Sequence, residues 1–418
     1  MTFIELFDKN PPENICACLV STPDRVILIG DNIKTLCTHK KRYEDFFLKR
    51  GKEIEFIPKA VNKNSLVKIV DLLCEIVETY DDCVFDLTGG DELMLVAVGI
   101  VFHQYRDMNI QMHRFNLRTN KIYDCDNDGT VIDIENIPEL TVEEYISLFG
   151  GKVSYENDSK IGTHLWDFTD AFRDDIDAMW EICRHNPREW NTQIAVFKAA
   201  QGLRVHDDNP YKTIAPIDKL TSLLMSTGYN YIYNSRIINS LIYYGLITFD
   251  NSDKDTLSIT YKNEQVRECL TKEGLILELE VTLAAMEAKD KHGDYVYTDV
   301  LNGVHIDWDG EIHESDDIYD IENEVDVIMT HNMVPVFVSC KNGKVEIDEL
   351  YKLDTVATKF GGKYARKVLV ATALGKESTF SLHLSQRAKD MGIRIVDNLQ
   401  DMNPTELQKC IRSLWSNH

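Results

Sequence analysis

The stretch Glu322–Lys341 reads ENEVDVIMTHNMVPVFVSCK, and its alternation decides the fold of the C-terminal part of the chain. Acidic and apolar residues alternate in its first half with the period of a half-buried strand. His331–Met333 supplies a turn, after which the alternation resumes, so the pattern predicts a β-hairpin. Asp326 lies on the first strand, and Ser339 and Lys341 project from one face of the second strand.

Upstream of this hairpin a helix is predicted, because Gly274–Glu278 opens a run with helical apolar spacing. The helix carries Glu278. Carboxylates beside a lysine on adjoining strands suit metal-assisted hydrolysis of a phosphodiester. In that reaction, Asp326 holds Mg2+ or Mn2+ and Lys341 stabilises the developing charge. The alternative is a solvated strand pair with scattered charges, because an aspartate followed by Ser-x-Lys is a weak signal by itself.

The elements after Lys341 continue this pattern. Val345–Phe360 has the spacing of an amphipathic helix, and the two glycines that follow it are typical of a helix C-terminus. A buried strand, a helix and another strand are predicted at Arg366–Thr372, Thr379–Met391 and Ile393–Val396. Helix, hairpin, helix and strand in this order indicate an α/β domain with an αβββαβ core.

Residues 1–145 alternate between strand and helix signals. Strands are predicted at Phe3–Phe7, Arg25–Gly30, Glu53–Ile57, Cys83–Leu87 and Ile110–Phe115. Helices are predicted at Ile33–Arg50, Ser65–Tyr80 and Glu92–Tyr105. This alternation is typical of a parallel, doubly wound sheet, which binds ligands at the carboxyl ends of its strands, where the strand order reverses.

Two loops at predicted strand ends are candidates for ligand binding. Asp8–Asn14 is polar and contains two prolines. Thr88–Asp91 follows the fourth strand; its two glycines permit close approach of the backbone, and the next helix directs free N–H groups at whatever lies above. The Thr88 hydroxyl can donate to a phosphate or ribose oxygen. The alternative is a tight turn in which Asp91 only caps the helix.

The middle of the chain has a different texture. Residues 146–165 read as a connector, and a helix at Phe172–Arg184 is predicted to end near Pro187. Two helices and a hairpin then form a winged-helix pattern, at Asp218–Met225, Ser235–Tyr244, Leu246–Phe249 and Thr256–Tyr261. Because the second helix offers one arginine, Arg236, a packing or spacer role is the alternative to reading DNA.

Composition sets the outer limits. The 418 residues suffice for two or three domains. Sixty-nine acidic and 45 basic residues give a net charge of −24, which argues against a broad surface that wraps duplex DNA. Ten cysteines without a CxxC pair indicate buried thiols in a reducing cytosol. We expect a cytoplasmic protein with no membrane contact, because the longest apolar run, Leu93–Phe102, is too short to span a bilayer and no signal-peptide pattern opens the chain.

Three histidines are tempting as metal ligands. His305, His313 and His331 lie near the hairpin in sequence, but no two of them have metal-ligand spacing on one element. We therefore expect them in loops or at the surface.

Two motifs resemble known families. Val84–Met94, with its Thr-Gly-Gly turn, resembles the ligand-binding turn of CARF domains, Rossmann-like sensors of cyclic oligoadenylates. Asp326 followed by Ser339-Cys340-Lys341 resembles the PD-(D/E)xK nucleases, with serine where the family usually has an acid. The combination is similar to ancillary effectors of type III CRISPR antiviral defence. The resemblance covers about two thirds of the chain.

The resemblance implies three domains: a CARF-like sensor at 1–145, a linker with a winged-helix-like module at 146–268, and a restriction-endonuclease-like domain at 269–418. It implies a homodimer that binds a cyclic oligoadenylate, cyclic tetra-adenylate, and is thereby allosterically activated. The substrate implied is DNA, single-stranded or supercoiled, with RNA as a further option and with low sequence specificity. Two rival functions are a CARF winged-helix transcriptional regulator with a degenerate nuclease domain, and a Rossmann-type nucleotide enzyme.

The resemblance also assigns site residues. The catalytic set is Glu278, Asp326, Ser339 and Lys341, and the Mn2+ or Mg2+ ligands are Glu278, Asp326 and the Cys340 carbonyl. The activator set is Asp8, Lys9, Asn10, Thr88, Gly89, Gly90 and Asp91. Ser339 departs from the nuclease pattern because a hydroxyl is a poor ligand for a hard cation. Asp91 and Glu92 depart from the sensor pattern, because relatives often carry Thr-Lys there.

Overall fold

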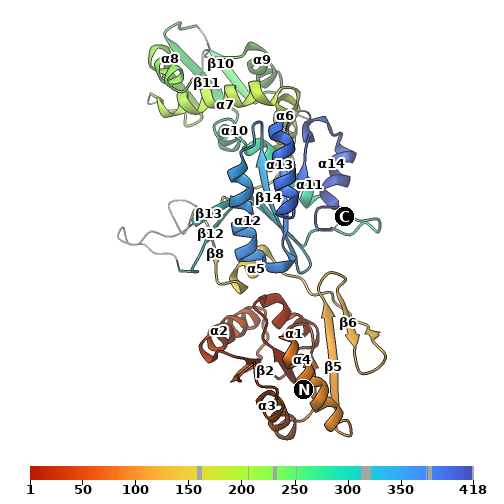
Figure 1. Cartoon of the computed structure of the whole chain (residues 1–418). Helices are drawn as coiled ribbons and strands as arrows, with labels where there is room; N and C mark the ends of the chain where they lie inside the picture. The colour runs from red at the N-terminus through yellow and green to blue at the C-terminus, as the bar shows by residue number, and fades with distance from the viewer. Residues whose placement is uncertain are drawn as a thin grey trace.

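The computed structural model describes residues 1–157, 162–205, 207–228, 233–250, 252–311, 322–372, 374 and 379–416. It has three sheets, of seven, three and six strands. In Figure 1 the red-to-orange N-terminal part lies at the bottom, the green middle part at the top, and the blue C-terminal part between them. The mixed α/β class predicted from the sequence is confirmed.

The seven-stranded sheet has the order β3-β2-β1-β4-β5-β6-β7. Its parallel strands are β1 Thr2–Leu6, β2 Arg25–Gly30, β3 Glu55–Ala60, β4 Cys83–Asp86 and β5 Ile110–Asn116. Between them lie α2 Ile33–Lys49, α3 Leu66–Thr79 and α4 Glu92–Gln104. The strand order reverses between β1 and β4, so their carboxyl ends form the crevice at which such sheets bind ligands.

Three features of this part were not predicted. Strands β6 Lys121–Asp124 and β7 Thr130–Ile132 extend the sheet with antiparallel pairing. The polar loop after β1 is a buried segment, η1 Pro11–Asn14 followed by α1 Cys16–Ser21. It is buried because the Asn14 side chain satisfies the loop internally, accepting from the Asp8 backbone N–H and donating to the Asp8 carbonyl, both at 2.7 Å.

The middle part contains the two helices and the hairpin predicted from the sequence. Its elements are α6 Asp170–His185, α7 Pro187–Gly202, β9 Lys212–Pro216, α8 Ile217–Ser226, α9 Ser235–Tyr243, β10 Ile247–Asp250, β11 Thr256–Tyr261 and α10 Glu264–Cys269. Pro187 begins a second long helix, which was not predicted. Proline is well tolerated there because the first turn has no intrahelical N–H bond to lose, and the Asn186 side chain caps the helix.

The six-stranded sheet has the order β16-β15-β14-β13-β12-β8. Its strands are β8 Lys152–Ser154, β12 Asp299–Asp307, β13 Glu322–His331, β14 Val334–Lys341, β15 Arg366–Ala371 and β16 Ile393–Val396. Helices α11 Leu275–Met286, α12 Ile347–Gly361, α13 Thr379–Asp390 and α14 Pro404–Arg412 accompany them, with short turns η2 Gly362–Tyr364 and η3 Leu399–Asp401. The predicted order of helix, hairpin, helix and strand is present.

The segment read as a connector also contributes structure. Strand β8 pairs antiparallel with β12 at the edge of the six-stranded sheet, and helix α5 Val142–Leu148 precedes it. The sheet thus draws a strand from residues that the sequence assigns to a linker. No helix in the described part of the chain is long and apolar enough to cross a membrane.

Helices cover both faces of the six-stranded sheet. The core on one face includes α11 residues together with Val327 and Val338. The core on the other face includes α12 residues together with Ile328 and Phe337. The two strands of the hairpin therefore lie between α11 and α12, which carry further polar groups to the same strand ends.

Candidate functional site

The hairpin strands separate where the site lies. The β13–β14 ladder ends at the pair Val327–Val338, one residue before Asp326 and Ser339. The Asp326 carboxylate occupies the opening: Oδ2 accepts the Cys340 backbone N–H at 2.6 Å and the Ser339 hydroxyl at 3.2 Å. A side chain thus replaces the missing ladder partner of β14, and the main chain fixes the position of Asp326.

Lys341 faces the same carboxylate from the end of β14. Its Nζ lies 3.5 Å from Asp326 Oδ2 and 3.2 Å from Glu349 Oε2. Burial lowers the pKa of Lys341, but the charges of these two carboxylates outweigh it and raise the pKa overall. Lys341 therefore stays an ammonium ion, the form that can stabilise a phosphate in the transition state.

Glu278 approaches the strands from α11. Burial raises the pKa of its carboxyl well above the usual range, and the charges of Asp326 and Glu324 raise it further. The Asn302 amide links the two sides, donating at 3.3 Å both to the Asp326 carbonyl and to Thr282 on α11. The structure therefore brings together two carboxyl groups whose negative charges repel each other, an arrangement that a cation would relieve.

The residues present fit a divalent cation with few protein ligands. Glu278 and Asp326 supply carboxylates, and the Cys340 carbonyl faces β13 because its own N–H does. Among the described residues, no three or more His, Cys, Asp or Glu side chains form a ready-made metal cluster. Mg2+ commonly binds through one or two carboxylates, waters and substrate phosphate, so this donor set is of the expected kind.

A pocket of about 370 Å³ opens beside these residues. Its polar lining consists of Asn323, Glu324, Asp326, Ser339, Lys341, Glu349 and Lys352. Sequence reasoning missed Glu349, whose neighbour Glu346 is exposed and pairs with Lys344. The signal that could have found Glu349 is its place in the first turn of the helix that follows Lys341.

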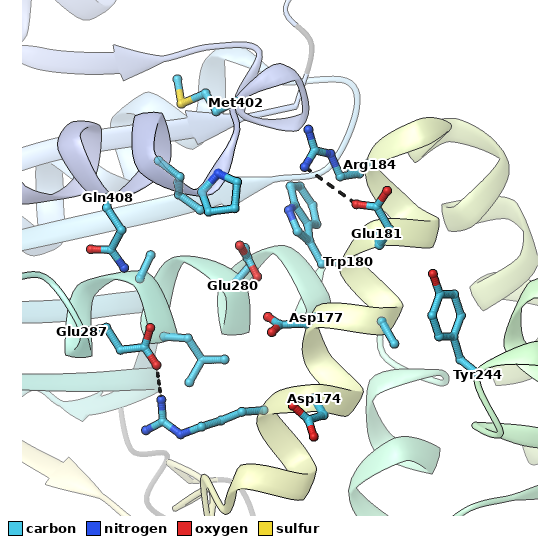
Figure 2. A pocket seen from close by; sticks show the side chains of 16 residues that line it. Asp174, Asp177, Trp180, Glu181, Arg184, Tyr244, Glu280, Glu287, Met402 and Gln408 are labelled. Atoms are coloured by element: carbon cyan, nitrogen blue, oxygen red, sulfur yellow. Dashed lines mark hydrogen bonds and ion pairs between the residues drawn. The ribbon is translucent and has the colours of Figure 1, made fainter.

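Figure 2 shows a second cavity, of about 570 Å³, between α6, α11 and the C-terminal helix. Glu280 on α11 points into it, two residues beyond Glu278, and burial raises its pKa to about 7. The other charged lining residues are Asp174, Asp177, Glu181, Glu287, Arg173 and Arg184. Both arginines are paired with glutamates of the lining, so the cavity repels a polyanion and is a poor site for nucleic acid.

A third pocket, of about 540 Å³, lies at the predicted crevice of the seven-stranded sheet. Its lining includes the predicted residues Asp8, Thr88, Gly89 and Gly90. Lys9 is exposed and Asn10 is buried, but neither lines the pocket. Asp91 also lies outside the lining and pairs with Lys63 at 3.5 Å.

Contacts with neighbouring strands fix the conformation of the Thr-Gly-Gly turn. The Thr88 hydroxyl donates to Asp86 Oδ1 and accepts the Phe115 N–H at 2.8 Å, so it is already engaged. A Cβ at Gly90, where φ is +97°, would lie 2.6 Å from Leu6 Cβ. Gly90 is therefore required by close contact with β1, and the backbone of the turn faces the pocket without obstruction.

Below the turn lie two buried acids. Glu5 and Asp86 are paired in register on β1 and β4, and both are almost fully buried. Burial raises the pKa of Glu5 well above its usual range, with Asp86 adding to the effect, and burial raises the pKa of Asp86 to about 6. Each carboxyl of the pair therefore keeps its proton to a higher pH than an exposed acid does, because burial raises both pKa values.

The cations of the pocket were not predicted. Arg114 on β5 lines it, and so does Lys363 from η2, which belongs to the C-terminal part of the chain. Arg114 lies within a predicted strand, and Lys363 is distant in sequence from the other residues that line the pocket. No sequence motif therefore indicated either cation as a ligand-binding residue.

The histidine expectation was wrong for two residues. The His331 ring stacks on Trp415 with centroids 3.7 Å apart, and burial lowers its pKa. The His305 side chain is only 15% exposed and lies 4.0 Å from Glu324. Both are held by packing on the inner strands β12 and β13, which a loop assignment overlooked. His313 lies outside the described residues.

Comparison with known proteins reveals likeness in fold. No protein-family model matches the sequence, and no curated protein matches it. Can2 from Sulfobacillus thermosulfidooxidans, solved in complex with cyclic tetra-adenylate, matches with a TM-score of 0.67 and 16% identity over 100% of this chain and 99% of its own. VC1899 from Vibrio cholerae matches with a TM-score of 0.69 and 18% identity over 99% and 97%. The likeness expected from the sequence is confirmed at the level of the fold: the chain shares the whole-length fold of Can2, solved with cyclic tetra-adenylate, and of VC1899.

Proposed function

We propose that this protein is a metal-dependent nuclease of type III CRISPR defence that a cyclic oligoadenylate activates. The observation that carries the proposal is the meeting of Asp326, Lys341 and Glu278 where β13 and β14 separate. The likeness to Can2, a protein solved with cyclic tetra-adenylate bound, supports the choice of activator. Within the proposal, residues 1–145 are the sensor, 146–268 the linker and winged-helix-like module, and 269–418 the nuclease.

In the proposed reaction each residue has a distinct part. Glu278, Asp326 and the Cys340 carbonyl would hold Mg2+ or Mn2+, and the chemistry that such an ion would supply there is activation of water and compensation of charge on the phosphate. Lys341 presents its ammonium to the phosphate, where it stabilises the charge that develops on the nonbridging oxygens. Ser339 donates to Asp326 and so orients the carboxylate. Glu349 positions the Lys341 side chain through their ion pair.

The activator pocket suits an anion at its rim. Arg114 and Lys363 line it, and the Gly89–Gly90 backbone lies open beside them. A cyclic oligoadenylate with two-fold symmetry would contact two copies of this pocket, so the proposal includes a homodimer with the ligand on its axis. DNA, single-stranded or supercoiled, is the proposed substrate, and RNA is tested beside it.

The rival function, a transcriptional regulator, finds less support. Helix α9 would be the DNA-reading helix, but its start packs against α7: the Asn234 side chain donates to Glu189 at 2.8 Å. Its backbone N–H donates to Gln193 at 2.6 Å. These contacts favour a packing role for the winged-helix-like module.

The proposal is tested with purified full-length protein, supercoiled plasmid, single-stranded DNA and RNA, in Mn2+ or Mg2+, with and without cyclic tetra-adenylate. We expect cleavage that needs both metal and activator and is lost in Lys341→Ala. Binding of the activator with no cleavage of any substrate would contradict the nuclease. A specific shift of DNA upstream of the protein's own gene would then favour the regulator.

A further inference from the structure

Lys363 stands at the junction of the two proposed sites. It belongs to η2, the turn that directly follows α12, yet it lines the pocket of the seven-stranded sheet. Every other lining residue of that pocket lies between Asp8 and Cys125. Lys363 is thus the point at which the C-terminal part of the chain reaches a ligand in this pocket.

In the structure the Lys363 ammonium is bound to a buried acid. Its Nζ lies 2.5 Å from Glu13 Oε2, and the Tyr364 hydroxyl donates to Glu13 Oε1 at 2.6 Å. The Glu13 side chain is 2% exposed, whereas that of Lys363 is 52% exposed. Burial raises the pKa of Glu13 despite these two contacts. Of the two partners, Lys363 is therefore the one free to turn toward solvent and toward an anion.

The turn is also packed tightly against the N-terminal part. A Cβ at Gly362, where φ is +58°, would lie 2.1 Å from Asn10 Oδ1. The Tyr145 hydroxyl donates to the Gly361 carbonyl at 3.3 Å. The Glu13–Lys363 ion pair thus lies beside close contacts that tie the end of α12 to the N-terminal part.

Helix α12 connects this turn to the nuclease site. Its 15 residues span about 22 Å, and its inner face is buried on the six-stranded sheet through Leu350, Val356 and Phe360. Glu349, in its first turn, holds Lys341 at 3.2 Å. Helix α12 (Figure 1) thus carries Glu349, the partner of the proposed catalytic lysine, in its first turn, and the pocket-lining Lys363 lies in the turn that follows its last residue.

We propose that a phosphate of the activator replaces Glu13 as the ion-pair partner of Lys363. Loss of the Glu13–Lys363 ion pair then shifts α12, and with it the Glu349–Lys341 ion pair. This inference rests on the proposed function and names the route by which the pocket regulates the nuclease. Lys363 is then both an activator-binding residue and the coupling residue. Arg114, on β5, lines the pocket from the N-terminal part of the chain, so in this proposal it binds the activator without belonging to the turn that follows α12.

The test compares Lys363→Met with the matched variant Arg114→Met, in the full-length protein, by measuring the Kd of cyclic tetra-adenylate and cleavage at saturating activator. Each loses a charge-assisted phosphate contact, so each raises the Kd about tenfold. At saturation we expect full cleavage in Arg114→Met and reduced cleavage in Lys363→Met. Lys363→Arg, which keeps the charge, restores most of both.

Glu13→Gln is the second variant, because substitutions of Glu13 and of Lys363 should change the Kd of the activator in opposite directions. Releasing Lys363 from competition lowers the Kd, whereas losing Lys363 raises it. A merely structural ion pair would weaken binding in both variants, and thermal melting identifies any variant that is misfolded. Equal behaviour of Lys363→Met and Arg114→Met at saturation, or weaker binding in a folded Glu13→Gln, overturns the inference. Failure of the wild-type protein to bind cyclic tetra-adenylate overturns the proposed function instead.

Discussion

Lys341 Nζ and Glu349 Oε2 lie 3.2 Å apart, and this ion pair joins the last residue of β14 to the first turn of α12. The pair is partly enclosed, because the side chains are 29% and 22% exposed. In the proposed reaction Glu349 is thus a positioning residue, which would act through Lys341 and through the charge that it places beside that ammonium.

The first prediction concerns pH. Glu349 contributes to the raised pKa of Lys341, and the ammonium form is the one that acts on phosphate. In the wild-type protein, activity falls as pH rises through that raised pKa. In Glu349→Gln one of the charges that raise the pKa of Lys341 is lost, so the alkaline fall in activity should move to lower pH. A pH–rate profile in Mg2+ measures the shift; the exposed Glu346→Gln is the control and should leave it in place.

The second prediction separates the two sites. Asp326→Asn and Lys341→Ala should each lower cleavage on the order of a hundredfold or more, because each removes preorganised charge from the reacting phosphate. The Kd of cyclic tetra-adenylate should stay at the wild-type value, because neither residue lines the other pocket. Equal loss of binding and cleavage would contradict this division of labour.

The third prediction uses the unusual serine. Ser339→Asp places a second carboxylate next to Asp326, so less Mn2+ should suffice for half-maximal cleavage. In metal-free buffer the same change should lower Tm, because two adjacent carboxylates repel each other at a half-closed site. Ser339→Asn is the control, because asparagine is similar in size to aspartate but neutral, so it separates the effect of the added charge from that of the added volume. A rise of Tm in metal-free Ser339→Asp would contradict the argument.

The fourth prediction concerns Glu5 and Asp86, the two buried acids below the Thr88–Gly90 turn. The pKa values of Glu5 and Asp86 are higher in the folded chain than in an unfolded one, so their contribution to stability is complete at low pH and is lost as pH rises. For Asp86, whose pKa is raised from 3.8 to about 6, the effect is about 3 kcal/mol. Glu5→Gln should therefore flatten the fall in unfolding free energy between pH 4 and pH 7. Urea unfolding at several pH values measures it, and a slope unchanged by the substitution would be the contrary result.

Periodic patterns made much of the fold predictable. Strands such as Arg25–Gly30 and helices such as Leu275–Met286 bury regular apolar faces, and their bounds were predicted to within a few residues. Short strands could not be predicted in this way. Lys121–Asp124 and Lys152–Ser154 are strands because they pair with neighbouring strands, and their own sequences are too short to show a periodic pattern. Pro187 misled because it was interpreted only as the end of one helix, whereas Asn186 is the C-cap of α6 and Pro187 is the first residue of α7.

The sites divide in the same way. Asp326, Ser339 and Lys341 were predicted to share a strand end, and the structure brings them together, because alternation on a hairpin fixes which side chains meet. Lys363 could not be foreseen near Thr88, since their proximity depends on how two sheets pack. The Thr88 hydroxyl already forms hydrogen bonds with Asp86 and with the Phe115 N–H, and these contacts could not be predicted from the sequence of the turn.

The contact of Tyr364 with Glu13 bears on how this protein could be re-engineered. A chimera that exchanged residues 1–145 for a sensor with another ligand would leave the 362–364 turn facing a foreign surface. The graft would have to include that turn, although it lies more than two hundred residues further along the chain. The useful boundary for such an exchange follows the contact surface and not the order of the sequence.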